Sequence, residues 1–446
     1  MMDTGLRLRL RALASLPGMT AAALFPAAAC ALLPAAGLAV LWVSAALAVG
    51  EWRSYSVLAA NHLLTLGWGT LVAMGALHQL FPAVLGVSSK PGPAAAVQFG
   101  LTAAGVLAVV LGLLAGRPGW VAAGGLGVLV SVVVFLAALV RLVPRRRRWP
   151  PPATGVLLSL GFLFFTVLWG ALMALNWNLR FWPALYTYLG LGVHAAAGLV
   201  GWFVQLVVAV SYYLLPRFTG VRTLPEKRVV PLLGLVNASV GSFVLAAVRG
   251  DPAPARLAAL LLSAAAFAYT WDLYRFLRGA RQTSPDLTNW HWWAIAAQTV
   301  LAGAAGLLWA AGLLPVDGRR LAAAAAVLVL CGWVTLAIMG QLYKVTPFLM
   351  WYYRYAQGLS AYDVPRLPAP YFPRWGLSAF ALTACGGSLL PAAVLAGSAA
   401  SARLAAVLFA AGCTVYAAGI AFSWIVAVLL RTPQPSPSPS VLGPKA

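Results

Sequence analysis

Residues 61–86, NHLLTLGWGTLVAMGALHQLFPAVLG, carry a pattern that returns twice more, each time within a long apolar stretch. Each copy has Gly-Trp and then Pro, fourteen positions after the Trp. The copies comprise Gly67, Trp68 and Pro82; Gly201, Trp202 and Pro216; and Gly332, Trp333 and Pro347. A Pro commonly closes a membrane helix, but one fixed spacing in three copies predicts a threefold internal repeat. We expect the three glycines to lie at helix contacts, where a missing side chain lets backbones approach.

The composition indicates a polytopic, all-α membrane protein. Apolar residues make up 62% of the 446 positions and charged residues only 9%, and many apolar runs reach the roughly 20 residues that cross a bilayer. Twelve spans are predicted, at 27–50, 56–81, 96–116, 119–142, 154–176, 186–214, 229–248, 256–277, 291–313, 320–346, 376–397 and 403–430. The net charge of +22 does not indicate nucleic-acid binding, because the basic residues lie between the spans, where membrane topology explains them.

The predicted organisation is a single twelve-helix transmembrane domain over residues 1–431, followed by a disordered Pro- and Ser-rich tail over residues 432–446. The repeat copies fall on the second, sixth and tenth spans, which predicts three groups of four helices about a pseudo-threefold axis. Twenty-two of the thirty Lys and Arg lie in the amino terminus, the even-numbered loops and the tail. Since positive loops stay in the cytoplasm, we expect a multi-pass protein of the cell inner membrane with both termini cytoplasmic.

Two of the four histidines are candidate ligands. His62 on the second span and His194 on the sixth lie near the start of their copies, about 9–12 Å in from the outer end at 1.5 Å per residue. Ionisable groups inside a membrane are rare and indicate function by default. The alternative is a hydrogen bond between helices, for which the small neighbouring residues leave room.

Twelve spans, cytoplasmic termini and a repeat on helices two, six and ten resemble the catalytic subunits of the haem-copper oxidases and nitric oxide reductases. The stretches HLLTLGW…GALHQLFP, HAAAGLVGW…SYYLLPRFTG and GW…GQLYKVTPFLMW are similar to those of divergent bacterial relatives. In that family, histidines on helices two, six, seven and ten hold haem and copper in a layer toward the outer face. The resemblance therefore implies one b-type haem, with His62 and His194 as its cofactor-binding and metal-ligating residues.

The chain departs from this family at the copper site. The family needs three histidines on helices six and seven, whereas the seventh span here contains none. On the tenth span, Val327 and Ala325 occupy the positions of a His-x-His pair. His194 aligns with Ala60, two residues out of register with His62, which on a helix turns it by about 200°. We therefore expect no copper and no intact oxygen reductase.

The other membrane-embedded polar rings are predicted to be interfacial anchors. His78 shares its repeat position with Tyr212 and Tyr343 near the cytoplasmic boundary, where amphipathic rings are common. His291, in NWHWW, begins a span within an aromatic belt. Neither histidine is expected to carry chemistry.

Two charged residues receive structural interpretations as well. Lys344 is expected to extend its ammonium to the interface. Asp272 lies one turn before Arg275, which favours an ion pair at a helix end.

The favoured hypothesis is a degenerate protein of the haem-copper oxidase fold that binds one haem and acts in respiration, nitric oxide handling or oxidase assembly. A transporter or channel is the alternative, opposed by the absent acidic pathway and by the lack of interrupted half-helices. A structural membrane subunit without cofactor is the third. The expected partners are the lipid bilayer, haem and other membrane subunits, and the sequence leaves open whether the protein is an enzyme.

Overall fold

The computed structural model describes residues 21–89, 92–186, 188–219, 226–280, 286–355 and 373–429, and these form helices without any strand. In this part of the chain, twelve helices are long and apolar enough to cross a membrane. They are Ala23–Ala48, Tyr55–Leu85, Pro93–Leu114, Pro118–Val140, Pro151–Leu179, Leu189–Arg217, Val229–Arg249, Pro252–Arg278, Leu287–Ala310, Gly318–Thr346, Arg374–Ala396 and Ala399–Ser423. The prediction of a twelve-helix, all-α membrane protein is confirmed, while the threefold grouping stays a prediction. The predicted tail, 432–446, lies outside the described residues.

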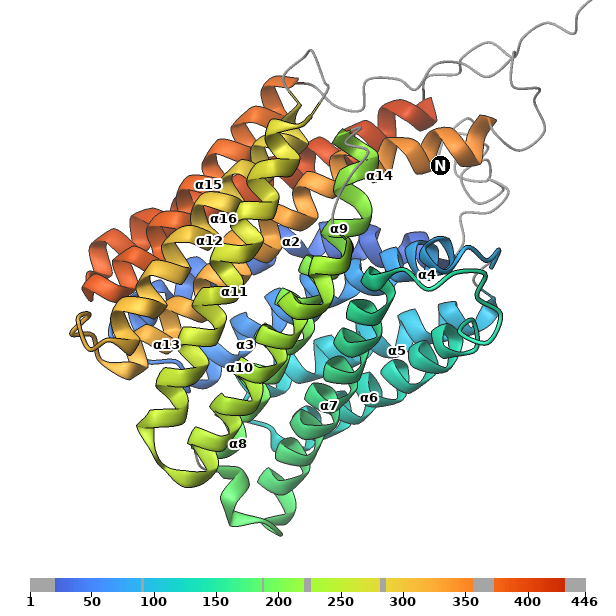
Figure 1. Cartoon of the computed structure of the whole chain (residues 1–446). Helices are drawn as coiled ribbons and strands as arrows, with labels where there is room; N and C mark the ends of the chain where they lie inside the picture. The colour runs from blue at the N-terminus through green and yellow to red at the C-terminus, as the bar shows by residue number, and fades with distance from the viewer. Residues whose placement is uncertain are drawn as a thin grey trace, which may run out of the picture.

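The helices lie side by side in one bundle (Figure 1). Their bounds are α2 (Ala21–Ala48), α3 (Tyr55–His62), η1 (Leu63–Thr70), α4 (Leu71–Leu85), α5 (Pro93–Leu114), α6 (Pro118–Val140), α7 (Pro151–Leu179), η2 (Pro183–Tyr186), α8 (Tyr188–Ala196), η3 (Ala197–Val204), α9 (Gln205–Thr219), η4 (Glu226–Arg228), α10 (Val229–Arg249), α11 (Pro252–Arg278), α12 (Leu287–Ala310), α13 (Gly318–Val327), η5 (Leu328–Val334), α14 (Thr335–Tyr355), α15 (Pro373–Ala396) and α16 (Ala399–Leu429). The first span, α2, packs against the last, α16, so the two ends of the described chain meet within the bundle.

The helix ends follow from residue type. Proline occupies the first turn of α5, α6, α7 and α11, where its missing N–H would have no helical partner anyway. Gly86 and Gly250 end α4 and α10 with φ of 70° and 66°, in the left-handed region that glycine adopts without a Cβ penalty. Asp251, Asp286 and Asp317 cap α11, α12 and α13 by accepting a backbone N–H.

The repeat prolines do not close their helices. Pro82 lies inside α4 and Pro216 inside α9, and α14 continues past Pro347 to Tyr355. The expectation that Pro ends each copy is therefore wrong. In the first copy the helix ends at Gly86, where the chain turns left-handed.

Each copy of the repeat contains a π-helical segment at its Gly-Trp pair. The segments η1, η3 and η5 span Leu63–Thr70, Ala197–Val204 and Leu328–Val334. A π-helical turn has a wider hydrogen-bond ring than an α-helical one and occurs frequently at functional sites. The spans are continuous but irregular at these three places, which weakens the objection to a transporter that rested on uninterrupted helices.

Two of the repeat glycines lie at tight helix contacts. A Cβ on Gly201 would lie 2.4 Å from the ring of Phe162, and one on Gly332 would lie 2.8 Å from the side chain of Gln298. The prediction of close packing is confirmed for these two. Gly67 has more room, since the nearest atom outside its own helix would be 3.5 Å away.

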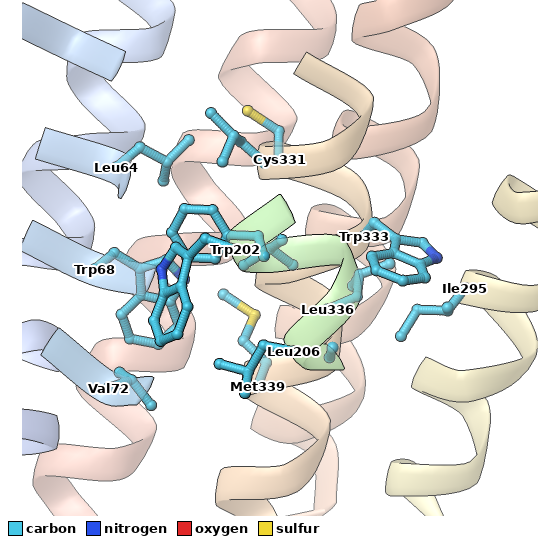
Figure 2. Close-up of a cluster of buried hydrophobic side chains, with 14 of the residues drawn as sticks. Leu64, Trp68, Val72, Trp202, Leu206, Ile295, Cys331, Trp333, Leu336 and Met339 are labelled. Atoms are coloured by element: carbon cyan, nitrogen blue, oxygen red, sulfur yellow. The ribbon is translucent and has the colours of Figure 1, made fainter. Parts of the chain in front are cut away.

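The three repeat tryptophans are buried in the interior, on the second, sixth and tenth spans (Figure 2). The Trp202 indole Nε1 donates a hydrogen bond to Thr70 Oγ1 at 3.2 Å and so joins the sixth span to the second. The Trp333 indole donates to Thr299 Oγ1 at 2.9 Å on α12. The tryptophans therefore hold the spans together at the depth of the π-helical segments.

Candidate functional site

A cavity of about 1080 Å³ lies among the helices, between one set of loops and the π-helical segments. Its mouth includes Trp52 and Asp251, which lie in loops, and Arg319 in the first turn of α13. Its far end includes Trp202 and Cys331. Most of the lining is apolar, and α13 contributes a run of alanines. Small side chains on α13 leave this space open. The volume lies slightly above the range for cofactor and ligand pockets, about 300–1,000 Å³.

His62 lines this cavity from the last residue of α3, directly before η1. Its Nδ1 donates to the carbonyl of Leu58 at 2.7 Å, one turn earlier on the same helix. In the neutral ring this leaves Nε2 as the nitrogen with the lone pair. The nearby Thr65 hydroxyl donates to the Asn61 carbonyl rather than to this ring.

His194 lines the same cavity from α8. Its Nδ1 donates to the carbonyl of Thr166 on α7 at 3.0 Å, so its Nε2 also keeps the lone pair. The ring packs against Gly170, where a Cβ would lie 2.8 Å from the imidazole Cε1. The buried hydroxyl of Thr166 has no hydrogen-bond partner among the described residues. The Thr166 Oγ1 beside His194 thus has hydrogen-bonding capacity that no described residue uses.

The two imidazoles lie next to each other, with ring centroids 6.2 Å apart and planes inclined by 23°. The two-residue register shift between the copies does not keep the rings apart. The two histidines lie on different helices, so their separation depends on how these helices pack and equal register is not needed. Sequence alignment of the copies did not contain this information.

The tenth span brings no third ligand to the pair. Val327 and Ala325 both line the cavity, at the positions where a histidine pair was sought. Within the described ranges, no three His, Cys, Asp or Glu side chains gather as a metal site would require. The two imidazoles are therefore an isolated pair, while Cys331, Asp251 and Asp317 line the same cavity without forming a group of three with them.

The mouth of the cavity carries charge of both signs. Asp317 accepts hydrogen bonds from the backbone N–H of Arg319 at 3.1 Å and from its Nε at 3.3 Å. The backbone hydrogen bond, more than the nearby guanidinium, lowers the pKa of this exposed carboxyl. Asp317 is thus an anion at neutral pH that ties Arg319 to the start of α13.

The three residues expected to be interfacial anchors are interior. His78, Tyr212 and Tyr343 are 7%, 0% and 4% exposed, so the anchor interpretation is wrong for all of them. His78 Nε2 hydrogen-bonds the Oε1 of Gln98 at 2.7 Å. Because Gln98 is itself completely buried, this contact joins α4 to α5 by a hydrogen bond away from lipid and water.

His291 is also buried rather than interfacial. It is 0% exposed, its Nδ1 donates to the Leu287 carbonyl at 2.8 Å, and its ring lies 4.7 Å from that of Phe380 between centroids. It does not line the cavity. His291 therefore belongs to helix packing.

The charged residues take partners from other helices. Asp272 pairs with Arg228 at 2.5 Å and accepts a hydrogen bond from the Tyr212 hydroxyl, also at 2.5 Å, so the predicted pairing with Arg275 is wrong. Lys344 forms an ion pair with Asp286, the cap of α12, rather than simply extending toward the interface.

No protein-family model matches the chain, and no curated protein sequence does either. The class that the fold and the cavity define is a twelve-helix membrane protein with two histidines lining an interior cavity.

Proposed function

We propose that the protein is a membrane haem protein of haem-copper oxidase-like fold, in which His62 and His194 hold one b-type haem. The observation that carries the proposal is the pairing of two neutral imidazoles at one wall of a large apolar cavity. Bonds from imidazole nitrogen to a metal ion are about 2.0–2.1 Å long, so two rings whose centroids are 6.2 Å apart are close enough to share one ion.

The hydrogen bonds around the two rings support a ligand role. A ligating histidine usually donates its second N–H to a carbonyl or carboxylate, which fixes the tautomer and the ring orientation. His62 and His194 both do so, through the carbonyls of Leu58 and Thr166. A hydrogen bond between helices would by itself explain the second contact but not the first, which stays within one helix.

A haem in this cavity would supply a one-electron redox couple. The chain's own contribution would be the imidazoles of His62 and His194 as ligands, within a largely apolar cavity. With two imidazoles and no second metal site among the described residues, we propose a role in electron transfer, nitric oxide handling or oxidase assembly rather than oxygen reduction. We place the protein in the cell inner membrane with both termini cytoplasmic, on the distribution of Lys and Arg.

The test is the absorption spectrum of the full chain, purified in detergent from cells supplied with ample haem precursor. The wild type should show a b-type spectrum. His62→Ala and His194→Ala should each lose the haem or convert it to a high-spin form, because one axial ligand is gone. His291→Gln removes an imidazole outside the cavity and should keep the wild-type spectrum. A colourless wild-type protein that takes up neither haem nor copper on titration would overturn the proposal.

A transporter or binding protein for an apolar molecule is the second candidate. The cavity volume and the irregular helices at its far end favour it. It predicts a colourless protein in which the two histidines only donate hydrogen bonds to backbone carbonyls. Their substitution by Ala would then cost about 1 kcal/mol of stability, in line with hydrogen bonds between membrane helices. A structural subunit makes the same spectral prediction and binds no small molecule.

A further inference from the structure

A second, smaller pocket lies at the opposite end of the bundle from the mouth of the cavity. It has a volume of about 300 Å³ and is lined by Arg148, Trp149, Pro150, Pro151, Tyr213 and Arg217. Arg148 lies beside the end of the second span, next to Gly86, whereas the cavity mouth lies near the end of the first span, where Gly50 meets Arg320. Successive spans end on opposite sides, so the pocket and the cavity are separate sites.

Both arginines in this pocket are held in place by backbone carbonyls, and Arg217 also by an aromatic ring, rather than by acids. Arg148 donates from Nε to the carbonyl of Val84 at 3.1 Å and from Nη2 to that of Ala83 at 2.9 Å. The Arg217 guanidinium carbon lies 3.5 Å from the centre of the Tyr213 ring, and its Nη1 donates to the Tyr213 carbonyl. Among the side chains that the structure describes, no carboxylate pairs with either guanidinium.

We propose that this pocket binds the phosphate of an anionic phospholipid headgroup. Two like charges fixed at one pocket without an acid favour an anionic ligand, and the planar fork of Arg suits phosphate oxygens. The helix start contributes no donor, because Pro150 and Pro151 have no N–H. The anion is therefore recognised by the guanidinium groups.

The surroundings of the pocket favour a lipid over a soluble anion. It is lined by the loop that joins the spans Pro118–Val140 and Pro151–Leu179 and by Tyr213 and Arg217 near the end of α9, at helix ends where headgroups lie. Trp149 is 40% exposed there, as interfacial tryptophans are. On the two spans that this loop joins, Val140 and Leu158 are 51% and 40% exposed and offer apolar surface to acyl chains. A free phosphate would make no use of this surface.

The experiment measures lipid binding to the full chain in neutral detergent by native mass spectrometry and by the shift in Tm. Dioleoylphosphatidylglycerol should bind and raise Tm, and dioleoylphosphatidylcholine should do neither. Arg217→Gln should weaken phosphatidylglycerol binding by about fivefold, the effect of one basic residue near an anionic headgroup. Arg278→Gln is the matched control, because Arg278 lies over Tyr274 in the same i, i+4 relation but outside the pocket. It should bind like the wild type.

Three results would overturn the proposal. The first is equal binding of both lipids. The second is an equal loss of phosphatidylglycerol binding in the Arg217→Gln and Arg278→Gln variants. The third is a rise in Tm with inorganic phosphate alone that equals the rise with phosphatidylglycerol. The last would assign the pocket to a soluble anion. If Arg217→Gln does not fold, Arg217→Lys carries the test. It keeps the charge and loses the fork, so its affinity should fall between wild type and the loss expected for Gln, whereas unchanged affinity would contradict recognition by the guanidinium.

Discussion

At the scale of single residues, polar groups inside this bundle are satisfied through space rather than along the chain. Asp272 is 3% exposed. It forms an ion pair with Arg228 at the start of α10 and accepts a hydrogen bond from the Tyr212 hydroxyl on α9. Arg275, one turn away on the same helix, is not its partner. An aspartate facing the interior cannot reach a neighbour on the outer face of its own helix, whatever the spacing.

Replacement of the true partner should therefore be costly. Arg228→Gln leaves the Asp272 carboxylate with only the Tyr212 hydroxyl, and we expect a loss of about 2 kcal/mol, between the values for exposed and buried pairs. Arg275→Gln should leave Tm in detergent unchanged. Equal losses of stability in Arg228→Gln and Arg275→Gln would mean that Asp272 is stabilised by the combined field of the nearby basic residues and not by one ion pair.

At the scale of elements, glycine contacts set how closely neighbouring helices pack. α5 and α6 meet at Gly105 and Gly124, where a Cβ on Gly124 would lie 2.7 Å from the Gly105 carbonyl oxygen. The obstacle is backbone, which cannot rotate away as a side chain can. The same helix has a second glycine, Gly127, whose Cβ would have its nearest neighbour at an ordinary 3.8 Å.

These two glycines provide a matched test of packing. Gly124→Ala should force α5 and α6 apart and destabilise the protein by about 1–3 kcal/mol, the usual cost of overpacking. Gly127→Ala should be neutral or stabilising by up to about 1 kcal/mol, because Ala favours the helix. Thermal unfolding in one detergent compares them. A stable Gly124→Ala protein would mean that the two helices can separate without loss.

At the scale of the whole molecule, alternate loops should face opposite sides of the membrane. In a background with the four cysteines replaced by Ser, Arg319→Cys on intact cells should react with a membrane-impermeant maleimide. Arg146→Cys should react only after permeabilisation, because its loop belongs to the positive set that stays inside. The reverse pattern would invert the topology, and labelling of both on intact cells would contradict the span assignment between them.

The twelve spans were predictable from the sequence because helices in lipid satisfy their own backbone hydrogen bonds, so length and apolar composition alone decide where they form. The repeat likewise predicted that the glycines at 201 and 332 lie at helix contacts. It did not reveal the π-helical segments, since a π turn and an α turn use the same residues and differ only in which carbonyl accepts each N–H.

The meeting of His62 and His194 was decided by tertiary structure alone. Register within a repeat describes direction around one helix axis, whereas the distance between two rings depends on how α3 packs against α2 and α5 and how α8 packs against α7 and α10. The same reason accounts for His78 and Tyr212, which were expected at the interface and are buried against Gln98 and Asp272. The sequence determined which residues are in the membrane, and packing determined which of them face one another.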